Sequence, residues 1–290
     1  MSLLPYDDRD GQIWLDGKLV PWREAKLHVL SHGLHYASSV FEGERAYGGK
    51  VFKLREHTER LERSANMLDF KLPYSRDAIE EATKTVVKVN HVQDGYVRPI
   101  AWRGAEQMAV TGAGTSIHLA IAAWVWPAYF DTSGKNKGIK LATSTWARPS
   151  PQTAPTAAKA SGLYMIATMS KHQAEAKGYT DALMLDYRGL VAECTGANIF
   201  FVMDGKLHTP NPDCILDGIT RRTIIDLARE RQLPVVERQI KPEEIKTAQE
   251  VFICGTAVEV TPVTTIDNQD YAVGPVTEGL MADYARFVRL

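Results

Sequence analysis

Residues 155–164 read Pro-Thr-Ala-Ala-Lys-Ala-Ser-Gly-Leu-Tyr, and the lysine among them, Lys159, decides how the rest of the chain is interpreted. It is the only charged residue between Arg148 and Lys171. An ammonium group surrounded by small residues is partly desolvated, which lowers its pKa and makes the neutral amine available near neutral pH. A Schiff-base lysine needs a neutral amine. The stretch therefore predicts a covalent anchor for a carbonyl group.

Two further segments have unusual composition. Residues 190–198 place a single carboxylate, Glu193, at the end of an apolar run and follow it with small residues, where it could hold a pyridinium proton. Residues 255–257 read Gly-Thr-Ala. In order and spacing, the three segments resemble the active-site signature of the class IV aminotransferases, which use pyridoxal phosphate and share one fold with D-amino acid transaminase. The branched-chain aminotransferases match best, over nearly the whole chain.

Composition limits the other possibilities. A chain of 290 residues with 44% hydrophobic content can form one large or two ordinary domains. Its formal charge is −1 and no block of like charges is long, which argues against nucleic-acid or membrane partners and favours a small molecule. Cys194, Cys214 and Cys254 are widely spaced and odd in number, so neither disulfides nor a metal site are expected.

The N-terminal residues 1–12 are polar and acidic, unlike a signal or transit peptide. No apolar stretch is long enough to span a bilayer. These features, with the unpaired cysteines, predict a protein of the cytoplasm.

Turn dipeptides indicate the sheet type. Pairs at 16–17, 48–49, 188–189 and 204–205 lie between short apolar runs, and each predicts a tight hairpin. Antiparallel neighbours therefore dominate, which disfavours a Rossmann fold. Apolar periodicity predicts helices at 54–68, 78–89, 163–176, 220–231 and 276–290.

These elements predict an α+β fold with mainly antiparallel sheets, as the resemblance to the fold of D-amino acid transaminase also implies. We expect a small N-terminal domain over 1–129 and a polar linker over 130–138. A larger C-terminal domain over 139–290 would carry the Schiff-base lysine. The resemblance further implies that the cofactor is held at the domain junction.

Roles for individual residues come from the resemblance. It implies that Lys159 binds pyridoxal 5'-phosphate covalently and carries a proton between the substrate Cα and the cofactor, while Glu193 pairs with the ring nitrogen. Tyr164 would hydrogen-bond the phenolic oxygen. The phosphate would be held by Arg60, from a His-x-x-Arg-Leu pattern, and by Ile219, Thr220 and Thr256. From the residues alone, the Gly218-to-helix junction offers unpaired amides and a helix dipole to an anion, but such junctions are too common to identify a phosphate site.

The substrate side is identified by two patterns that resemble the branched-chain enzymes, Tyr-x4-Phe-x-Gly-x-Arg at 36–45 and Tyr-x-Arg at 96–98. By resemblance, an aliphatic side chain would bind in a pocket formed by Tyr36, Phe41, Trp126, Tyr129 and Ala257. The α-carboxylate would be held by Tyr96 and the amides of Thr256 and Ala257. Arg98 would accept the distal carboxylate of glutamate. Without the resemblance, the aromatic residues would be assigned to ordinary core packing.

The expected reaction is a reversible ping-pong transamination of L-leucine, L-isoleucine and L-valine with 2-oxoglutarate, by a homodimer or higher homo-oligomer. A D-amino acid or R-selective amine transaminase and a 4-amino-4-deoxychorismate lyase share the fold, and a non-catalytic cofactor-binding protein is an alternative of another class. Leu163, Cys194 and Glu44 depart from the commoner branched-chain pattern, which leaves substrate breadth open.

Overall fold

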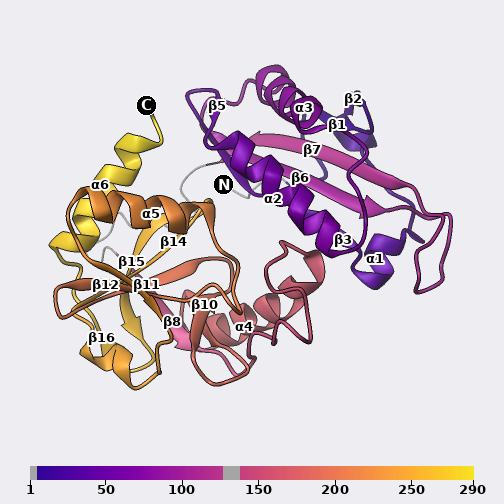
Figure 1. Ribbon diagram of the computed structural model, residues 1–290. Helices are drawn as coiled ribbons and strands as arrows, with labels where there is room; N and C mark the ends of the chain where they lie inside the picture. The colour runs from indigo at the N-terminus through magenta and orange to yellow at the C-terminus, as the bar shows by residue number, and fades with distance from the viewer. Residues whose placement is uncertain (1–4, 127–137) are drawn as a thin grey trace. The chain divides into compact units, whose positions relative to one another are not determined.

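The computed structural model describes residues 5–126 and 138–290. The chain divides into two compact units, one of Met1–Pro127 with Ala158–Gly162 and one of Ala128–Ala157 with Leu163–Leu290. Figure 1 shows each unit as a sheet with helices packed on it. Within the described residues, no helix is long and apolar enough to cross a membrane. The predicted linker lies almost wholly outside the described residues, so the domain boundary stays a prediction.

The first unit contains a seven-stranded sheet with the order β2-β1-β7-β6-β4-β5, and β3 also pairs with β6. The strands are β1 (Gln12–Leu15), β2 (Lys18–Pro21), β3 (Ser39–Phe41), β4 (Glu44–Tyr47), β5 (Lys50–Val51), β6 (Gly95–Arg103) and β7 (Ile117–Val125). The helices are α1 (His32–Tyr36), α2 (Leu54–Met67) and α3 (Arg76–Val89), with a 3-10 turn at Trp22–Glu24. Helices α2 and α3 pack against each other and against the sheet. All strand pairs in this unit are antiparallel.

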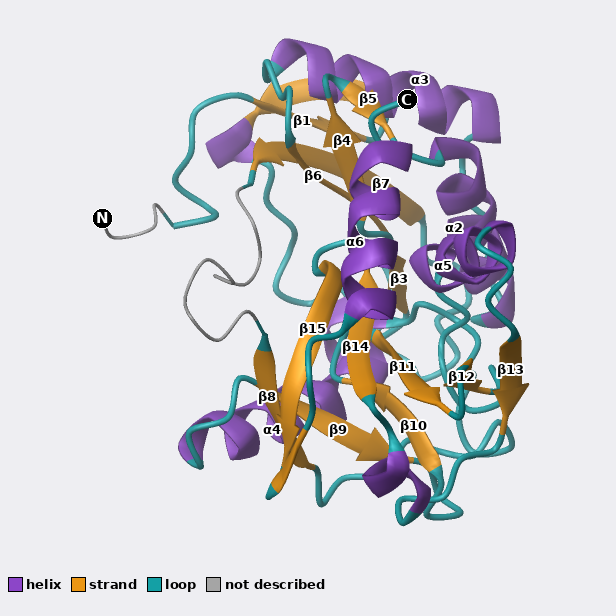
Figure 2. Ribbon diagram, turned by 90° about the vertical axis from the view of Figure 1, so that its left-hand side faces the viewer, coloured by secondary structure: helices purple, strands orange, loops and turns teal. Residues whose placement is uncertain are grey.

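The second unit contains a nine-stranded sheet with the order β10-β9-β8-β15-β14-β11-β12-β13, and β16 pairs with β15. Its strands are β8 (Ile139–Thr143), β9 (Asp181–Leu185), β10 (Val191–Cys194), β11 (Asn198–Met203), β12 (Lys206–Pro210), β13 (Val235–Arg238), β14 (Glu250–Gly255), β15 (Glu259–Ile266) and β16 (Gln269–Asp270). Its helices are α4 (Tyr164–Ala176), α5 (Ile219–Glu230) and α6 (Pro275–Phe287). The chain also forms 3-10 turns at Ser161–Leu163 and Glu244–Thr247. Figure 2 separates these helices and strands by colour.

The four hairpins expected from turn dipeptides are confirmed. They join β1 to β2, β4 to β5, β9 to β10 and β11 to β12, each with antiparallel register. At Asp16 and Asp204 the backbone φ is positive (46° and 51°), a conformation that these short polar residues tolerate better than most. Parallel pairs also occur in the second sheet, β12 with β13, β8 with β9 and β8 with β15. The α+β prediction is confirmed.

The five predicted helices are all present, with ends within two residues of expectation except the C-terminus of α6. Helix α3 begins earlier than predicted because the Ser75 side chain caps it by accepting a hydrogen bond from the amide of Ala78. One face of the second sheet forms a buried core of mainly aliphatic residues from its strands. The stacked pair Phe200 and Phe252 is buried on the other face, because neighbouring strand residues point to opposite sides. These cores explain why the sheets are rigid enough to position polar side chains at their edges.

Candidate functional site

Lys159 is held in place through its backbone. Its amide donates to Ser64 Oγ on α2 at 2.9 Å, and its carbonyl accepts from the amide of Phe41 at 3.1 Å. Ala160 forms a bridge with Val40. The flanking alanines are buried, which explains the small residues around the lysine, and Lys159 itself is half-buried with Nζ 4.8 Å from the Phe41 ring centre.

These bonds attach Ala158–Gly162 to the first unit. The expectation that the C-terminal domain carries this lysine stays a prediction. The contacts of residues 158–162 with the first unit come from the backbone bridge to β3 and the bond to the Ser64 side chain on α2, which hydrophobic periodicity does not reveal.

One face of the first sheet gathers the predicted substrate residues. Phe41 pairs with Ile100 and Arg45 with Tyr96, so by strand alternation Phe41, Arg45, Tyr96 and Arg98 point to the same side. The Arg98 guanidinium lies 4.6 Å from the Phe41 ring centre and 5.3 Å from that of Tyr96. This places a cation on an aromatic surface.

The glycine of the Phe-x-Gly-x-Arg pattern has a steric role here. A Cβ at Gly43 would overlap the hydroxyl of Tyr96. The Trp126 ring also meets Tyr96 edge-on, with ring centres 4.5 Å apart. The structure therefore brings Phe41, Tyr96, Arg98 and Trp126 together, and their roles toward substrate stay predictions.

Arg98 has an unused donor in this cluster. Its Nη2 lies 3.4 Å from Tyr96 Oη, but its buried Nε has no hydrogen-bond partner among the residues that the structure describes. A buried N–H without a partner is costly, and such groups are often completed by a ligand. This cluster can therefore accept an anion.

Arg60 lies on the opposite side of the same sheet. Its Nε donates to Glu42 Oε1 at 2.7 Å and its Nη2 to Glu42 Oε2 at 2.8 Å. His57 Nδ1 lies 2.7 Å from the same Oε2, and all three residues are buried. Burial alone would raise the pKa of Glu42, but the charge and hydrogen bonds of Arg60, and then those of His57, lower it. Burial lowers the pKa of His57, against the opposing effect of Glu42. The arrangement is an ionised pair with a neutral imidazole.

Glu44 shares the face of Glu42. It pairs with Val97, is 1% exposed, and its Oε2 has no hydrogen-bond partner within the described part of the chain. Burial, followed by the charge of Glu42, raises its pKa well above the ordinary value. Because Glu44 points away from Tyr96 and Arg98, this departure from the family pattern leaves the aromatic face intact.

In the second unit, Glu193 is the third residue of β10 and is 7% exposed. Arg148 Nε lies 3.1 Å from its Oε1, and Asn198 Nδ2 lies 3.4 Å from its Oε2. Cys194, the neighbouring departure from the pattern, is buried in the core, and burial raises the pKa of its thiol well above the ordinary value. Arg148 and Asn198 were not predicted from the sequence. Asn198 belongs to residues 190–198, the segment that contains Glu193, but nothing in the sequence pointed to Arg148.

The predicted phosphate residues begin α5. Gly218 is the N-cap, no side chain caps the helix, and Ile219 and Thr220 are both 3% exposed. Thr256 and Ala257 form the half-buried turn after β14, and a Cβ at Gly255 would lie 3.4 Å from the carbonyl oxygen of Gly196. The turns after β10 and β14 therefore lie side by side. An uncapped helix start and hydroxyl groups are suited to a phosphate.

Three further residues were predicted for the site. Tyr164 is the first residue of α4 and is half-buried. Tyr36 on α1 is 43% exposed, and its hydroxyl donates to the carbonyl of Met108 at 3.1 Å. Tyr129 lies outside the described residues. Their roles stay predictions.

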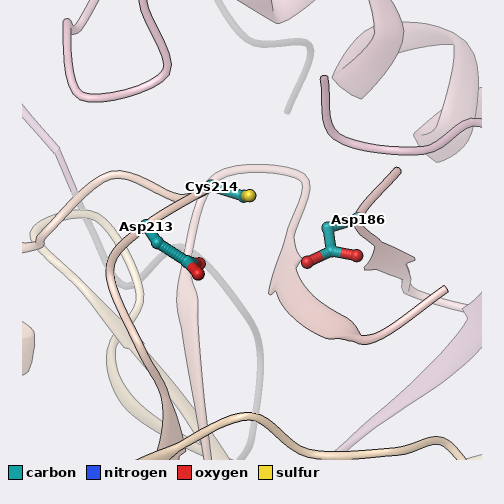
Figure 3. A group of neighbouring side chains, drawn as sticks. All are labelled: Asp186, Asp213 and Cys214. Carbon is teal, nitrogen blue, oxygen red and sulfur yellow. The ribbon is translucent and has the colours of Figure 1, made fainter. Parts of the chain in front are cut away.

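Asp186, Asp213 and Cys214 lie close enough together to ligate a cation (Figure 3). However, Arg188 Nη2 bonds Asp186 Oδ2 at 2.6 Å and Asp213 Oδ2 at 2.9 Å, and lies 3.5 Å from Cys214 Sγ. Burial raises the pKa of the Cys214 thiol to about 11. A guanidinium already balances the carboxylates, so we assign no metal to this group.

A model of the family described as amino-transferase class IV matches residues 39–266. The branched-chain-amino-acid aminotransferase of Pseudomonas aeruginosa is 43% identical over 284 residues, covering 96% of this chain and 92% of that protein. The enzyme of the same name from Escherichia coli K12 is 41% identical, covering 92% and 89%.

Solved structures of branched-chain aminotransferases also superpose on this chain. The T.th. branched-chain amino acid aminotransferase with pyridoxamine 5'-phosphate superposes with a TM-score of 0.93 at 39% identity, covering 97% of this chain and 96% of that one. The enzyme of Thermoproteus uzoniensis with norvaline gives the same TM-score and identity, covering 97% and 95%.

Proposed function

Because the chain belongs to the class IV aminotransferases, we propose that it transfers the amino group of L-leucine, L-isoleucine or L-valine to 2-oxoglutarate, with pyridoxal 5'-phosphate as cofactor. The reaction is reversible and yields branched 2-oxo acids and L-glutamate. Support comes from relatives that cover nearly the whole chain and from the chemistry of the residues described above.

The donor set fits this cofactor. When bound, the cofactor supplies a carbonyl for an amine and a protonated ring that withdraws electrons from the substrate Cα. Lys159 would hold the carbonyl carbon, Glu193 the ring nitrogen and Tyr164 the phenolic oxygen. The phosphate would be held by Arg60, Ile219, Thr220 and Thr256. The uncapped start of α5 and the buried hydroxyl of Thr220 are the features that suit a phosphate.

Lys159 would also be the base. Once released from the carbonyl carbon, its amine would accept the proton from the substrate Cα and return it at the carbon that Lys159 had held. Glu193 is bonded by Arg148, and a cation beside a buried carboxylate favours the ionised form. An ionised carboxylate in turn favours a protonated ring nitrogen.

Arg98 is the observation that carries the substrate assignment. Its buried Nε, for which the described part of the chain offers no hydrogen-bond partner, and its place on Phe41 and Tyr96 suit a pocket for both an aliphatic side chain and the distal carboxylate of glutamate. Tyr36, Phe41, Trp126, Tyr129 and Ala257 would line the aliphatic part. Tyr96 and the amides of Thr256 and Ala257 would hold the α-carboxylate.

The Arg98→Ala variant tests this assignment. Losing a charged hydrogen bond should lower kcat/KM for 2-oxoglutarate by about 10–100-fold, while branched 2-oxo acids, which lack a second carboxylate, should change by less than about threefold. Steady-state kinetics with both substrates measure the ratio, with exposed Arg63→Ala on α2 as the control. Equal losses for both substrates would remove Arg98 from this role.

The Lys159→Ala variant tests the covalent step. Transamination should stop, whereas binding of pyridoxamine 5'-phosphate should persist because the phosphate residues remain. Substantial residual turnover would contradict the mechanism. Difference spectra of the loaded protein with L-leucine and with D-alanine separate the branched-chain assignment from the D-amino acid alternative.

We also propose that the chain works as a homo-oligomer. Exposed apolar side chains gather on two segments of the first unit, around α1 and in the β6–β7 loop: Leu27, Val29, Leu30, Leu34 and Val110. Hydrogen bonds of Tyr36 and His32 to Met108 and Ala109 join these segments. Apolar patches of this kind mark association surfaces. Leu34→Asp should lower the molecular mass measured by light scattering, because a buried charge would dissociate the oligomer. Leu290→Asp, at another exposed position, should leave the mass unchanged.

A cytoplasmic location stays a prediction.

A further inference from the structure

Both oxygens of Glu193 are held by side chains that also hold the chain segment leading into α5. Arg148 Nε lies 3.1 Å from Glu193 Oε1 and 3.4 Å from the carbonyl oxygen of Cys214. Asn198 Nδ2 lies 3.4 Å from Glu193 Oε2 and donates to the carbonyl of Leu216 at 2.9 Å. The two donors therefore connect one carboxylate to the same short segment, residues 214–216.

Both donors come from residues whose backbone is hydrogen-bonded to a neighbouring strand. Asn198 is the first residue of β11 and pairs with Cys254 of β14. The Arg148 amide donates to the carbonyl of Leu185 at 2.8 Å, and Arg148 forms a bridge with Asp186. Arg148 is 6% exposed and Asn198 is 5% exposed. Buried side chains on paired strands have little freedom, so the positions of Glu193 and residues 214–216 are set together.

Asn198 also decides the residue at the N-cap of α5. Gly218 has φ −66° and ψ 138°, which any amino acid adopts, so backbone strain does not require glycine there. A Cβ at this position would overlap Asn198 Oδ1. Glycine is present because Asn198 occupies the adjacent space. The amide side chain thus contacts the Glu193 carboxylate, the Leu216 carbonyl and the start of the helix.

We propose that Asn198 is a positioning residue that fixes the spacing between the Glu193 carboxylate and the first turn of α5. This inference rests on the proposed function, in which Glu193 binds the ring nitrogen of the cofactor and α5 binds its phosphate. In this proposal Asn198 acts through Glu193 and residues 214–216, whose side-chain and backbone oxygens it contacts. Its role is to keep the Glu193 carboxylate and the first turn of α5 at a constant distance, so that one ligand can reach both.

A positioning role predicts a particular pattern of binding. A ligand that reaches both ends gains from the correct spacing, whereas a fragment that reaches only one end does not. In Asn198→Ala, we expect pyridoxamine 5'-phosphate to bind about 10-fold or more weakly, since Glu193 and the first turn of α5 are no longer held at a fixed spacing. Pyridoxamine and inorganic phosphate, each measured alone, should weaken by less than about threefold.

The experiment uses titration calorimetry on the full-length chain freed of cofactor, with the two fragments measured by competition. Thr277→Val is the matched control, because this buried hydroxyl on α6 has no partner among the described residues. It should leave all three affinities unchanged. Equal losses for fragments and whole ligand in Asn198→Ala, or no loss at all, would overturn the proposal.

A double-mutant cycle tests whether the effect of Asn198 on binding depends on Glu193. If Asn198 acts through Glu193, adding Asn198→Ala to Glu193→Gln should weaken binding of pyridoxamine 5'-phosphate far less than it does alone. Fully additive losses would contradict this. Absence of pyridoxamine 5'-phosphate binding to the wild-type chain would instead refute the proposed function itself.

Discussion

Replacing Glu44 by glutamine should stabilise the first unit, and increasingly so as pH rises. Glu44 is 1% exposed, and its pKa is raised well above the ordinary value of 4.5 by burial and then by the charge of Glu42. The unfolded chain releases this proton near the ordinary value, whereas the folded chain retains it. Above that pH the folded state binds one proton more than the unfolded state, so stability falls as pH rises.

The slope follows from this proton count. One extra bound proton changes the free energy of unfolding by about 1.4 kcal/mol per pH unit. Because glutamine does not titrate, the stability of Glu44→Gln minus that of wild type should grow by about 1.4 kcal/mol for each unit above about pH 5.5. The growth should stop where Glu44 ionises in the folded protein.

Urea denaturation at several pH values, at one protein concentration and without cofactor, measures this difference. Glu230→Gln, at an exposed position on α5, serves as the control and should give a flat line. A difference between Glu44→Gln and wild type that does not change with pH would refute the reasoning. It would mean that the Glu44 carboxyl is ionised in the folded protein.

One further variant tests the proposed site, and one labelling experiment tests the burial of the cysteines. Gly43→Ala should leave the fold intact but lower kcat/KM for L-leucine and 2-oxoglutarate by about 10-fold or more, since the new Cβ displaces the Tyr96 hydroxyl; unchanged kinetics would contradict the steric role of Gly43. Cys194, Cys214 and Cys254 are buried and their pKa values are raised, first of all by burial, so iodoacetamide at pH 8 should not label the native protein in mass spectrometry. Rapid native labelling of any of the three would contradict their burial.

Several features of the structure depend on contacts between residues that are distant along the chain. The position of Lys159 with the first unit depends on hydrogen bonds to Ser64 and Phe41. Glu42 and His57 were not selected from the sequence because charged and polar residues are usually solvated. Only the structure shows that they are buried with Arg60.

The sequence by itself determined the hairpins, the helices and the residue types of the site, because turn chemistry, apolar periodicity and motif spacing are local properties. The resemblance to the branched-chain enzymes also selected Phe41, Tyr96, Arg98 and Trp126. Strand register places the first three on one face, and the Trp126 ring packs on Tyr96. Only the tertiary structure decided which groups are paired and which are unsatisfied. Arg60 forms a hydrogen-bonded ion pair with Glu42, and Glu193 is bonded by Arg148 and Asn198. The buried Nε of Arg98 has no hydrogen-bond partner among the described residues. Burial and hydrogen bonding depend on long-range packing, so they are set by the folded chain and not by any local pattern.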